Sequence, residues 1–202
     1  MTAAAVPFTL PSHLPAAVAA VREALSRHGV IALPTETFYG LAVDPDDEAA
    51  VARVFAIKGR DAAKALLLVV ADVAQAEGVA ALDEARRAAL AVVWPAPLTV
   101  VLPARRPLAA AGATVAVRVP AHPLLRSLLA RVGPLTATSA NRGGVPPCAA
   151  ATAVRHALAD DVDLILDGGP TAGGLPSTLV DWTGNRPLLL RPGAFALPLS
   201  WR

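Results

Sequence analysis

The feature that most constrains this chain is the stretch Val30–Asp44, where an apolar run leads directly into polar residues. Val30–Leu33 is typical of a buried strand, and Pro34 ends the strand ladder because it has no N–H to donate. The polar residues that follow are Thr35, Glu36 and Thr37. Because ligands bind at the carboxyl ends of strands in open α/β sheets, this stretch favours an α/β fold with a site at the strand end.

The remaining chain interleaves strand-like and helix-like segments without strict alternation. Further strands are predicted at 66–70, 98–102, 115–119, 135–138, 163–166, 179–182 and 188–190. Helices are predicted at 15–27, 46–58, 83–92, 124–132 and 152–159. We therefore expect a single domain at 12–198, with a twisted, open, mixed sheet and helices on its faces. Residues 1–11 show little pattern and are expected to form a loosely attached N-terminal arm.

Composition excludes several classes of protein. The longest apolar runs, such as 62–73, contain charges and are shorter than the ~20 residues that a membrane span needs. The N-terminus has no basic segment before an apolar core, so we expect a cytoplasmic protein without a membrane segment. One cysteine, Cys148, and four scattered histidines offer no metal-ligand spacing, and no protein metal site is predicted.

The choice of cations is more informative than the net charge of +2. Among 18 lysines and arginines, only Lys58 and Lys64 are lysine, and they lie in one short segment. Because lysine presents a compact ammonium, this clustering indicates that a function in this segment favours an ammonium over a guanidinium.

Polar and cationic residues gather at or near the ends of several predicted strands. They are Thr35, Thr37, Arg118, Ser139, Asn141, Ser177, Thr178 and Arg191. If they converge, they form a pocket rich in donors and poor in acids, suited to a polyanion with a carboxylate nearby. The sequence contains no P-loop, no GxGxxG after a strand and no GxSxG. Catalysis by positioning and charge neutralisation is therefore favoured over a protein nucleophile.

Each of these features also has an ordinary structural explanation. Lys58 and Arg60 are cations at the end of a predicted helix, where they interact well with its dipole. Arg118 and Arg191 could each pair with one surface acid, and Ser139–Asn141 could be a helix-capping loop. Their occurrence together favours a site.

At the level of motifs the chain resembles the YrdC family of threonylcarbamoyl-AMP synthases, over roughly residues 14–197. The motifs are PTETFYGLAVD, KGRDAAK, WPAPLTVVLPA, VRVPAHP, TSANRGG, LPSTLVDW and LLRPGAF. The most specific part is the pairing of K-x-R, Lys58 and Arg60, with S-x-N, Ser139 and Asn141. The resemblance implies the short, single-domain form, with a twisted open α/β sheet around a basic concave cavity.

The resemblance also implies an activity. L-threonine, bicarbonate or CO2, and ATP would give L-threonylcarbamoyl-AMP and pyrophosphate, with Mg2+, and the product would pass to a threonylcarbamoyl transferase that modifies tRNA. The residues implied for catalysis and for the ATP phosphates are Lys58, Arg60, Ser139 and Asn141, with Arg191 on the nucleotide. Those implied for L-threonine are Thr35, Arg118 and Ser177, with Arg118 on the carboxylate.

Two local departures and three alternatives accompany this resemblance. Ala65-Leu66 stands where the family usually has Pro-Leu, and Gly143-Gly144 where it usually has Ser-Gly, which puts loop geometry in question.

The alternatives are an RNA-binding module, a relative that uses another carbamoyl acceptor, and an inactive paralogue. An aromatic content of only 4% offers few stacking platforms for RNA, and the intact K-x-R and S-x-N motifs argue against lost activity.

Overall fold

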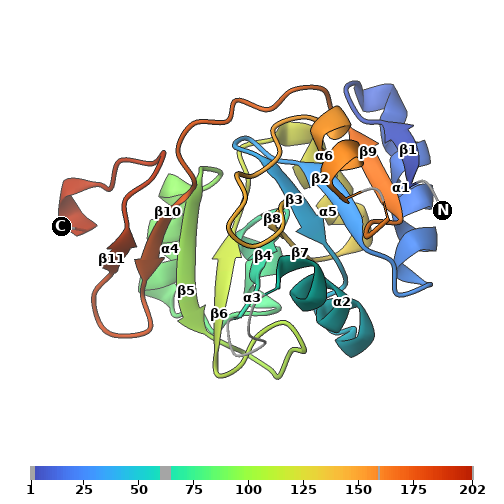
Figure 1. Ribbon diagram of the computed structural model, residues 1–202. Helices are drawn as coiled ribbons and strands as arrows, with labels where there is room; N and C mark the ends of the chain where they lie inside the picture. The colour runs from blue at the N-terminus through green and yellow to red at the C-terminus, as the bar shows by residue number, and fades with distance from the viewer. Residues whose placement is uncertain (1–2, 60–64, 159, 202) are drawn as a thin grey trace.

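The computed structural model describes residues 3–59, 65–158 and 160–201 and contains two mixed β-sheets with helices packed against them (Figure 1). The first sheet has the order β1 (Ala4–Pro7), β9 (Leu164–Asp167), β2 (Ile31–Pro34), β3 (Tyr39–Ala42) and β8 (Thr138–Ser139). The second has the order β11 (Leu188–Arg191), β10 (Thr178–Asp181), β5 (Leu98–Pro103), β6 (Thr114–Arg118), β4 (Leu67–Val69) and β7 (Leu135–Thr136). The predicted α/β class is confirmed, with the strands divided between two sheets.

The predicted helices are all present with small shifts of their ends. They are α1 (Leu14–Leu25), α2 (Glu48–Lys58), α4 (Glu84–Val93), α5 (Pro123–Val132) and α6 (Ala151–Leu158). The short helix α3 (Val73–Glu77) and the 3-10 turns η1 (Pro11–His13) and η2 (Leu199–Trp201) were not predicted. Within the described ranges, none of these helices combines the length and the apolar character that crossing a bilayer requires.

Two hydrophobic clusters hold the sheets and helices together. One includes Val54 of α2 and the inward-facing valines of β5 and β6, Val100 and Val117, all fully buried. The other joins α1 to α5 through Val21 and Leu128. Burial of this apolar area is the main favourable contribution to folding and gives the strands a rigid setting.

The two sheets meet where β7 runs into β8. Thr136 is the last residue of β7 and pairs with Leu68 of the second sheet, while Thr138 opens β8 and pairs with Leu41 of the first. The prediction of one continuous strand at 135–138 is therefore wrong, because the chain changes sheets at Ala137. Strand β3 was also missed, since it follows β2 through a tight turn and forms an antiparallel hairpin with it.

Helix α2 is positioned by a cap at each end. The side chain of Asp47 accepts a hydrogen bond from Ala50 N at 3.1 Å, which satisfies one of the free N–H groups of the first turn. Gly59 ends the helix in the left-handed conformation with φ of 56°, a conformation that glycine adopts without steric cost. These caps fix Lys58 as the last residue of the helix.

The N-terminal segment is part of the first sheet. Strand β1 pairs in parallel with β9 from Ala4↔Leu164 to Pro7↔Asp167, and Phe8 N donates to Asp167 O at 2.7 Å. The side chain of Phe8 is 1% exposed within the cluster that joins α1 and α5. The expectation of a loosely attached arm at 1–11 is wrong for these residues, because four residues are too few to show a strand pattern in the sequence.

The anchoring of this segment can be measured by replacing Phe8. We expect Phe8→Ala to lower the free energy of unfolding by about 3–5 kcal/mol, since it leaves a cavity in a packed core. Leu10→Ala is the control, because Leu10 is 53% exposed and its loss should change stability by less than ~0.5 kcal/mol. Urea denaturation measures the stability of both variants. Equal denaturation midpoints for the two variants would show that the N-terminal segment is only loosely attached.

Candidate functional site

A cavity of about 330 Å³ lies between the two sheets and contains most of the predicted site residues. The first sheet contributes β3, β8 and the turn before β3, and the second contributes β4, β5, β6, β10 and β11. The predicted site residues that line it are Thr35, Arg118, Ser139, Ser177 and Arg191. Ala65, at one of the departures from the family pattern, lines it as well. Residues from distant parts of the sequence therefore converge as expected.

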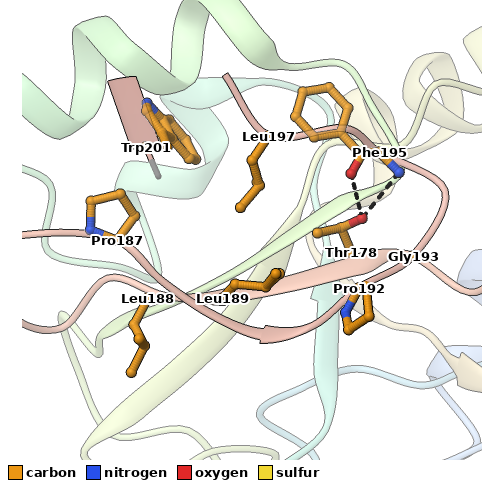
Figure 2. Close-up of a pocket in the computed structure, with 9 residues that line it drawn as sticks. All are labelled: Thr178, Pro187, Leu188, Leu189, Pro192, Gly193, Phe195, Leu197 and Trp201. Atoms are coloured by element: carbon orange, nitrogen blue, oxygen red, sulfur yellow. Dashed lines mark hydrogen bonds between the residues drawn. The ribbon is translucent and has the colours of Figure 1, made fainter. Parts of the chain in front are cut away.

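A second cavity of about 480 Å³ lies beside β11 and differs in character (Figure 2). Its lining includes Leu188, Leu189, Phe195, Leu197 and Trp201, and among the described residues no charged side chain contributes to it. Of the polar residues expected to converge, Thr178 lines this cavity, and none of the residues that the motif resemblance implies does so. This apolar cavity is therefore assigned no part in binding the polyanion and carboxylate expected from the sequence.

The turn between β2 and β3 brings the hydroxyl of Thr35 to the cavity. Thr35 Oγ1 donates to Phe38 O at 2.7 Å and accepts from Thr37 N at 3.2 Å. The hydroxyls of Thr35 and Thr37 lie 3.2 Å apart, and both residues are buried. The side chain that shapes the turn is thus also one that a ligand would meet.

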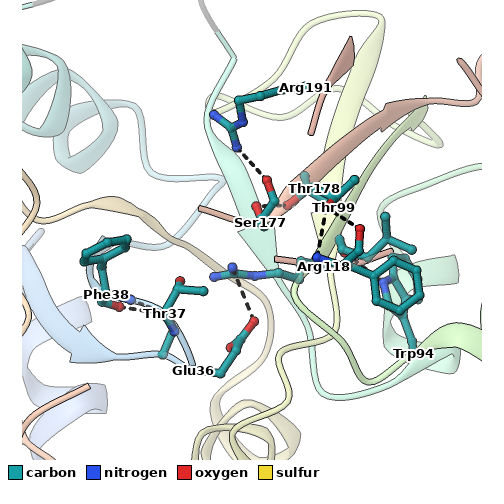
Figure 3. Close-up of polar contacts among 12 residues, drawn as sticks. Glu36, Thr37, Phe38, Trp94, Thr99, Arg118, Ser177, Thr178 and Arg191 are labelled. Atoms are coloured by element: carbon teal, nitrogen blue, oxygen red, sulfur yellow. Dashed lines mark hydrogen bonds and ion pairs between the residues drawn. The ribbon is translucent and has the colours of Figure 1, made fainter. Parts of the chain in front are cut away.

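Arg118 is the last residue of β6 and is only 3% exposed. As the alternation predicted, it lies on the face opposite Val115 and Val117, but that face is buried too at this end of the strand. A guanidinium nitrogen of Arg118 lies 3.4 Å from a carboxylate oxygen of Glu36, and Figure 3 draws this ion pair. Burial lowers the pKa of Arg118, the Glu36 carboxylate acts in the opposite direction, and the charge of Arg191 lowers it further.

Glu36 lies beside the cavity and was not predicted as a site residue. It stands in the polar run Thr35–Thr37, which provided a signal, but the pocket was expected to be poor in acids. Both oxygens of its carboxylate are buried and lack a hydrogen-bond partner, as does Nε of Arg118. A carboxylate therefore lies directly beside the arginine that the motif resemblance assigns to a ligand carboxylate.

Ser177 and Arg191 are held together at the wall of the cavity that the second sheet forms. Arg191 donates to Ser177 O at 3.0 Å, and the hydroxyl of Ser177 lies 2.8 Å from that of Thr99 (Figure 3). Thr99 was not predicted as a site residue, because it lies within the apolar-looking strand β5. Its hydroxyl gives Ser177 a buried partner and so fixes the orientation of the Ser177 side chain.

Lys58, Ser139 and Asn141 form a compact hydrogen-bonded group beside the cavity. Lys58 Nζ donates to Ser139 O at 2.7 Å, to Ser139 Oγ at 3.1 Å and to Asn141 Oδ1. Ser139 Oγ donates to Asn141 Oδ1 at 2.7 Å, and Asn141 Nδ2 donates to Val145 O. Lys58 is 5% exposed, so its ammonium helps to build the loop as well as to place a charge near the cavity. Arg60, the other half of K-x-R, lies outside the described residues.

Gly143 explains how this loop approaches α2 so closely. A Cβ atom at position 143 would lie 2.6 Å from the carbonyl oxygen of Lys58, closer than real contacts allow. Gly144 has φ of 78°, which favours glycine. The departure from the family pattern at Gly143-Gly144 therefore has a structural counterpart in a tight contact between the loop and the end of the helix.

The donor set of the site suits anions better than metal ions. Among the residues that the structure describes, no three His, Cys, Asp or Glu side chains come together to hold a metal. Lys58, Arg118 and Arg191 instead offer ammonium and guanidinium groups, which bind carboxylate and phosphate oxygens through charge-assisted hydrogen bonds.

Comparison with known proteins gives concordant matches. The family model Sua5/YciO/YrdC, described as telomere recombination, matches residues 23–193. A threonylcarbamoyl-AMP synthase of Chromohalobacter salexigens is 46% identical over 78% of this chain and 88% of its own length. One of Bacillus subtilis is 38% identical over 84% of this chain but only 51% of its own length, so the chain spans about half of that relative.

Solved structures include a similar fold with an amino acid bound. The crystal structure of Sua5 from P. abyssi complexed with L-threonine superposes with a TM-score of 0.83 at 34% identity. The superposition covers 96% of this chain and 58% of the P. abyssi chain.

The contact of Gly193 with the Ser177 segment generates a prediction about the cavity wall. A Cβ atom at Gly193 would lie 2.3 Å from Pro176 O and 2.5 Å from Thr178 N, both backbone atoms. We expect Gly193→Ala to cost about 1–3 kcal/mol of stability and to displace Arg191 from Ser177 O. Thermal or urea denaturation measures the cost.

Gly112→Ala provides the matched control, since nothing lies within 4 Å of a Cβ at Gly112. Its stability should equal or slightly exceed that of the wild type, because alanine restricts the unfolded chain. If Gly193→Ala is as stable as this control, Gly193 does not hold the wall in place.

Proposed function

The chain belongs to the Sua5/YciO/YrdC family, and from that premise we propose that it is an L-threonylcarbamoyladenylate synthase, a nucleotidyltransferase. In this proposal it joins L-threonine, bicarbonate or CO2, and ATP, and it releases pyrophosphate. The observation that carries the proposal is the buried guanidinium of Arg118 in the same cavity as Ser139 and Arg191. One end of this cavity offers a partner for a carboxylate and the other a group of donors for phosphates.

The amino-acid end is formed by Arg118, Thr35 and Ser177. A guanidinium binds a carboxylate through two parallel N–H bonds, which makes Arg118 the group for the α-carboxylate of threonine. Thr35 and Ser177 present hydroxyls that both donate and accept, which suits the polar groups of the remaining amino acid. These hydroxyls lie on opposite walls, so a ligand between them contacts both sheets.

The nucleotide end is formed by Lys58, Ser139, Asn141 and Arg191, and we include Arg60 on the basis of its motif. Lys58 and Arg191 bring positive charge, and the loop at 139–145 carries backbone and side-chain donors. The ammonium of Lys58 is bound to Ser139 and Asn141. Binding of ATP phosphates would therefore add to an existing network or exchange part of it.

The chemistry requires positioning rather than a protein nucleophile. The amine of threonine attacks the carbon of CO2 and loses a proton, which gives a carbamate. A carbamate oxygen then attacks the α-phosphorus of ATP, and pyrophosphate leaves. Both partners of the second step are anions, so fixed cations that screen them and hold them in line lower the barrier.

Magnesium fits this site as a companion of ATP. The described residues contain no cluster of metal ligands, and Mg2+ commonly binds through substrate phosphates and water with few protein ligands. When bound, it supplies charge neutralisation for the leaving pyrophosphate.

We further propose that the adenylate passes to a threonylcarbamoyl transferase that modifies tRNA, which makes the cytoplasm the expected location. Direct contact of this chain with tRNA is an alternative suggested by the sequence pI of 9.2. Salt-dependent RNA binding without ATP turnover would favour that alternative.

The decisive experiment measures pyrophosphate release from ATP, Mg2+ and bicarbonate in the presence of each amino acid in turn. Release that depends on L-threonine supports the proposal, with detection of threonylcarbamoyl-AMP by mass spectrometry. Release with another amino acid, or none with any, would reject it.

Arg118→Lys tests the proposed amino-acid end. Lysine keeps the charge but cannot reproduce a bidentate contact, so we expect threonine affinity to fall about ten- to a hundredfold. ATP affinity should change little. Calorimetric titration of both ligands measures the two effects.

The matched control is Arg105→Lys, because Arg105 is exposed on a different surface and bonds to Glu77 O. It should bind both ligands like the wild type. If Arg118→Lys lowers the affinities for threonine and ATP equally, Arg118 is instead a structural ion-pair partner.

A further inference from the structure

The carboxylate of Glu36 lacks the hydrogen bonds that a buried charge normally has. Both of its oxygens are buried without a hydrogen-bond partner, and its side chain is only 14% exposed. The contact with Arg118 at 3.4 Å is longer than the about 2.7–2.9 Å of a charge-assisted hydrogen bond. Because such burial is costly, the position of this carboxylate calls for an explanation beyond fold stability.

The charges around Glu36 suggest what it does. Arg118 lies beside it, Arg191 is near enough to lower the pKa of Arg118, and the Glu36 charge also acts on the half-buried His122. Burial lowers the pKa of His122, which favours its neutral form. No acidic side chain lines the cavity among the described residues. Glu36 is not itself a lining residue, so its negative charge acts on this end of the cavity from its place beside Arg118.

The guanidinium of Arg118 without a carboxylate beside it would attract any small anion. Bicarbonate, phosphate and pyrophosphate would all compete for Arg118 if no negative charge stood beside it. With Glu36 in place, a plain anion at Arg118 meets attraction from the guanidinium and repulsion from the carboxylate. An α-amino acid meets the same two effects at its carboxylate, but its ammonium is attracted by Glu36. The carboxylate thus favours a ligand that carries both charges.

We propose that Glu36 is a specificity-determining residue that makes the Arg118 end of the cavity selective for zwitterionic amino acids over anions without an ammonium group. This inference rests on the proposed function, because it concerns the same amino-acid end. Glu36 acts through its charge on the ligand and on Arg118, and no proton transfer is assigned to it.

The test compares L-threonine with (R)-3-hydroxybutanoate, which has the same hydroxyl and carboxylate but no ammonium. The ratio of the two dissociation constants is measured by calorimetry or by competition in wild type and in Glu36→Gln, which keeps the shape of the side chain. We expect the preference for threonine to fall at least about tenfold in Glu36→Gln, as loss of one nearby charge interaction predicts. Inorganic phosphate should also become a better competitor of threonine in this variant.

Two further variants separate the charge from the packing. Glu36→Asp keeps the charge and should retain most of the preference for threonine, which also provides a second measurement if Glu36→Gln folds poorly. Glu84→Gln removes a carboxylate that is 80% exposed on α4 and should leave the preference unchanged.

The outcomes distinguish this inference from the proposed function. If Glu36→Gln lowers the affinity for L-threonine and for (R)-3-hydroxybutanoate equally, the ratio of their dissociation constants stays at the wild-type value. This result overturns the inference and identifies Glu36 as a structural partner of Arg118. If the wild type still releases pyrophosphate with threonine in that case, the proposed function stands. A wild type that neither binds threonine nor turns over with it overturns both.

Discussion

The site depends on the way Thr136 joins the two sheets. This fully buried residue donates its N–H to Val43 O at 3.0 Å, while its hydroxyl accepts from Val43 N at 3.0 Å. The hydroxyl also donates to Leu41 O at 3.4 Å. A side chain on β7 thereby completes the hydrogen bonding of β3, which belongs to the other sheet. Two parts of the cavity wall are tied to this junction. Ser139 follows it on β8, and Arg118 lies on β6, which pairs with β4, the strand that also pairs with β7.

The charges are distributed over the cavity in an order that suits its proposed chemistry. In the proposed function Lys58 and Arg191 would bind phosphates, whereas Arg118, paired with Glu36, would bind the amino acid. The first group can neutralise a highly charged ligand, and the second pair is close to neutral as a whole. In the proposed function, two anionic reactants would thus be brought together without one large positive patch that either could occupy. Such an arrangement contributes to catalysis through preorganised electrostatics.

Much of this arrangement could be predicted from the sequence, and the failures have physical causes. The strand ends at Thr35, Arg118 and Ser177 were recognised because polar residues interrupt apolar runs, and the family and fold class were confirmed. Strand β1 was missed because four residues carry too little periodicity, although Phe8 anchors it. The change of sheets at Ala137 leaves no local signal, since it depends on hydrogen bonds to Val43 and Leu67, which are remote in sequence. Glu36 was seen but not assigned, because its importance arises from the neighbouring Arg118.

The division of the cavity between two sheets has a consequence for the thermodynamics of the fold. A ligand that contacts Thr35 on one sheet and Ser177 on the other acts as a reversible cross-link between them. By linkage, such a ligand stabilises every state in which both walls are in place and disfavours partial opening at the junction. Amide hydrogen exchange in β4 and β8 would then slow on saturation, even at positions that never touch the ligand. Ligand binding at the site and opening of the sheet junction are therefore thermodynamically linked, because each shifts the equilibrium of the other.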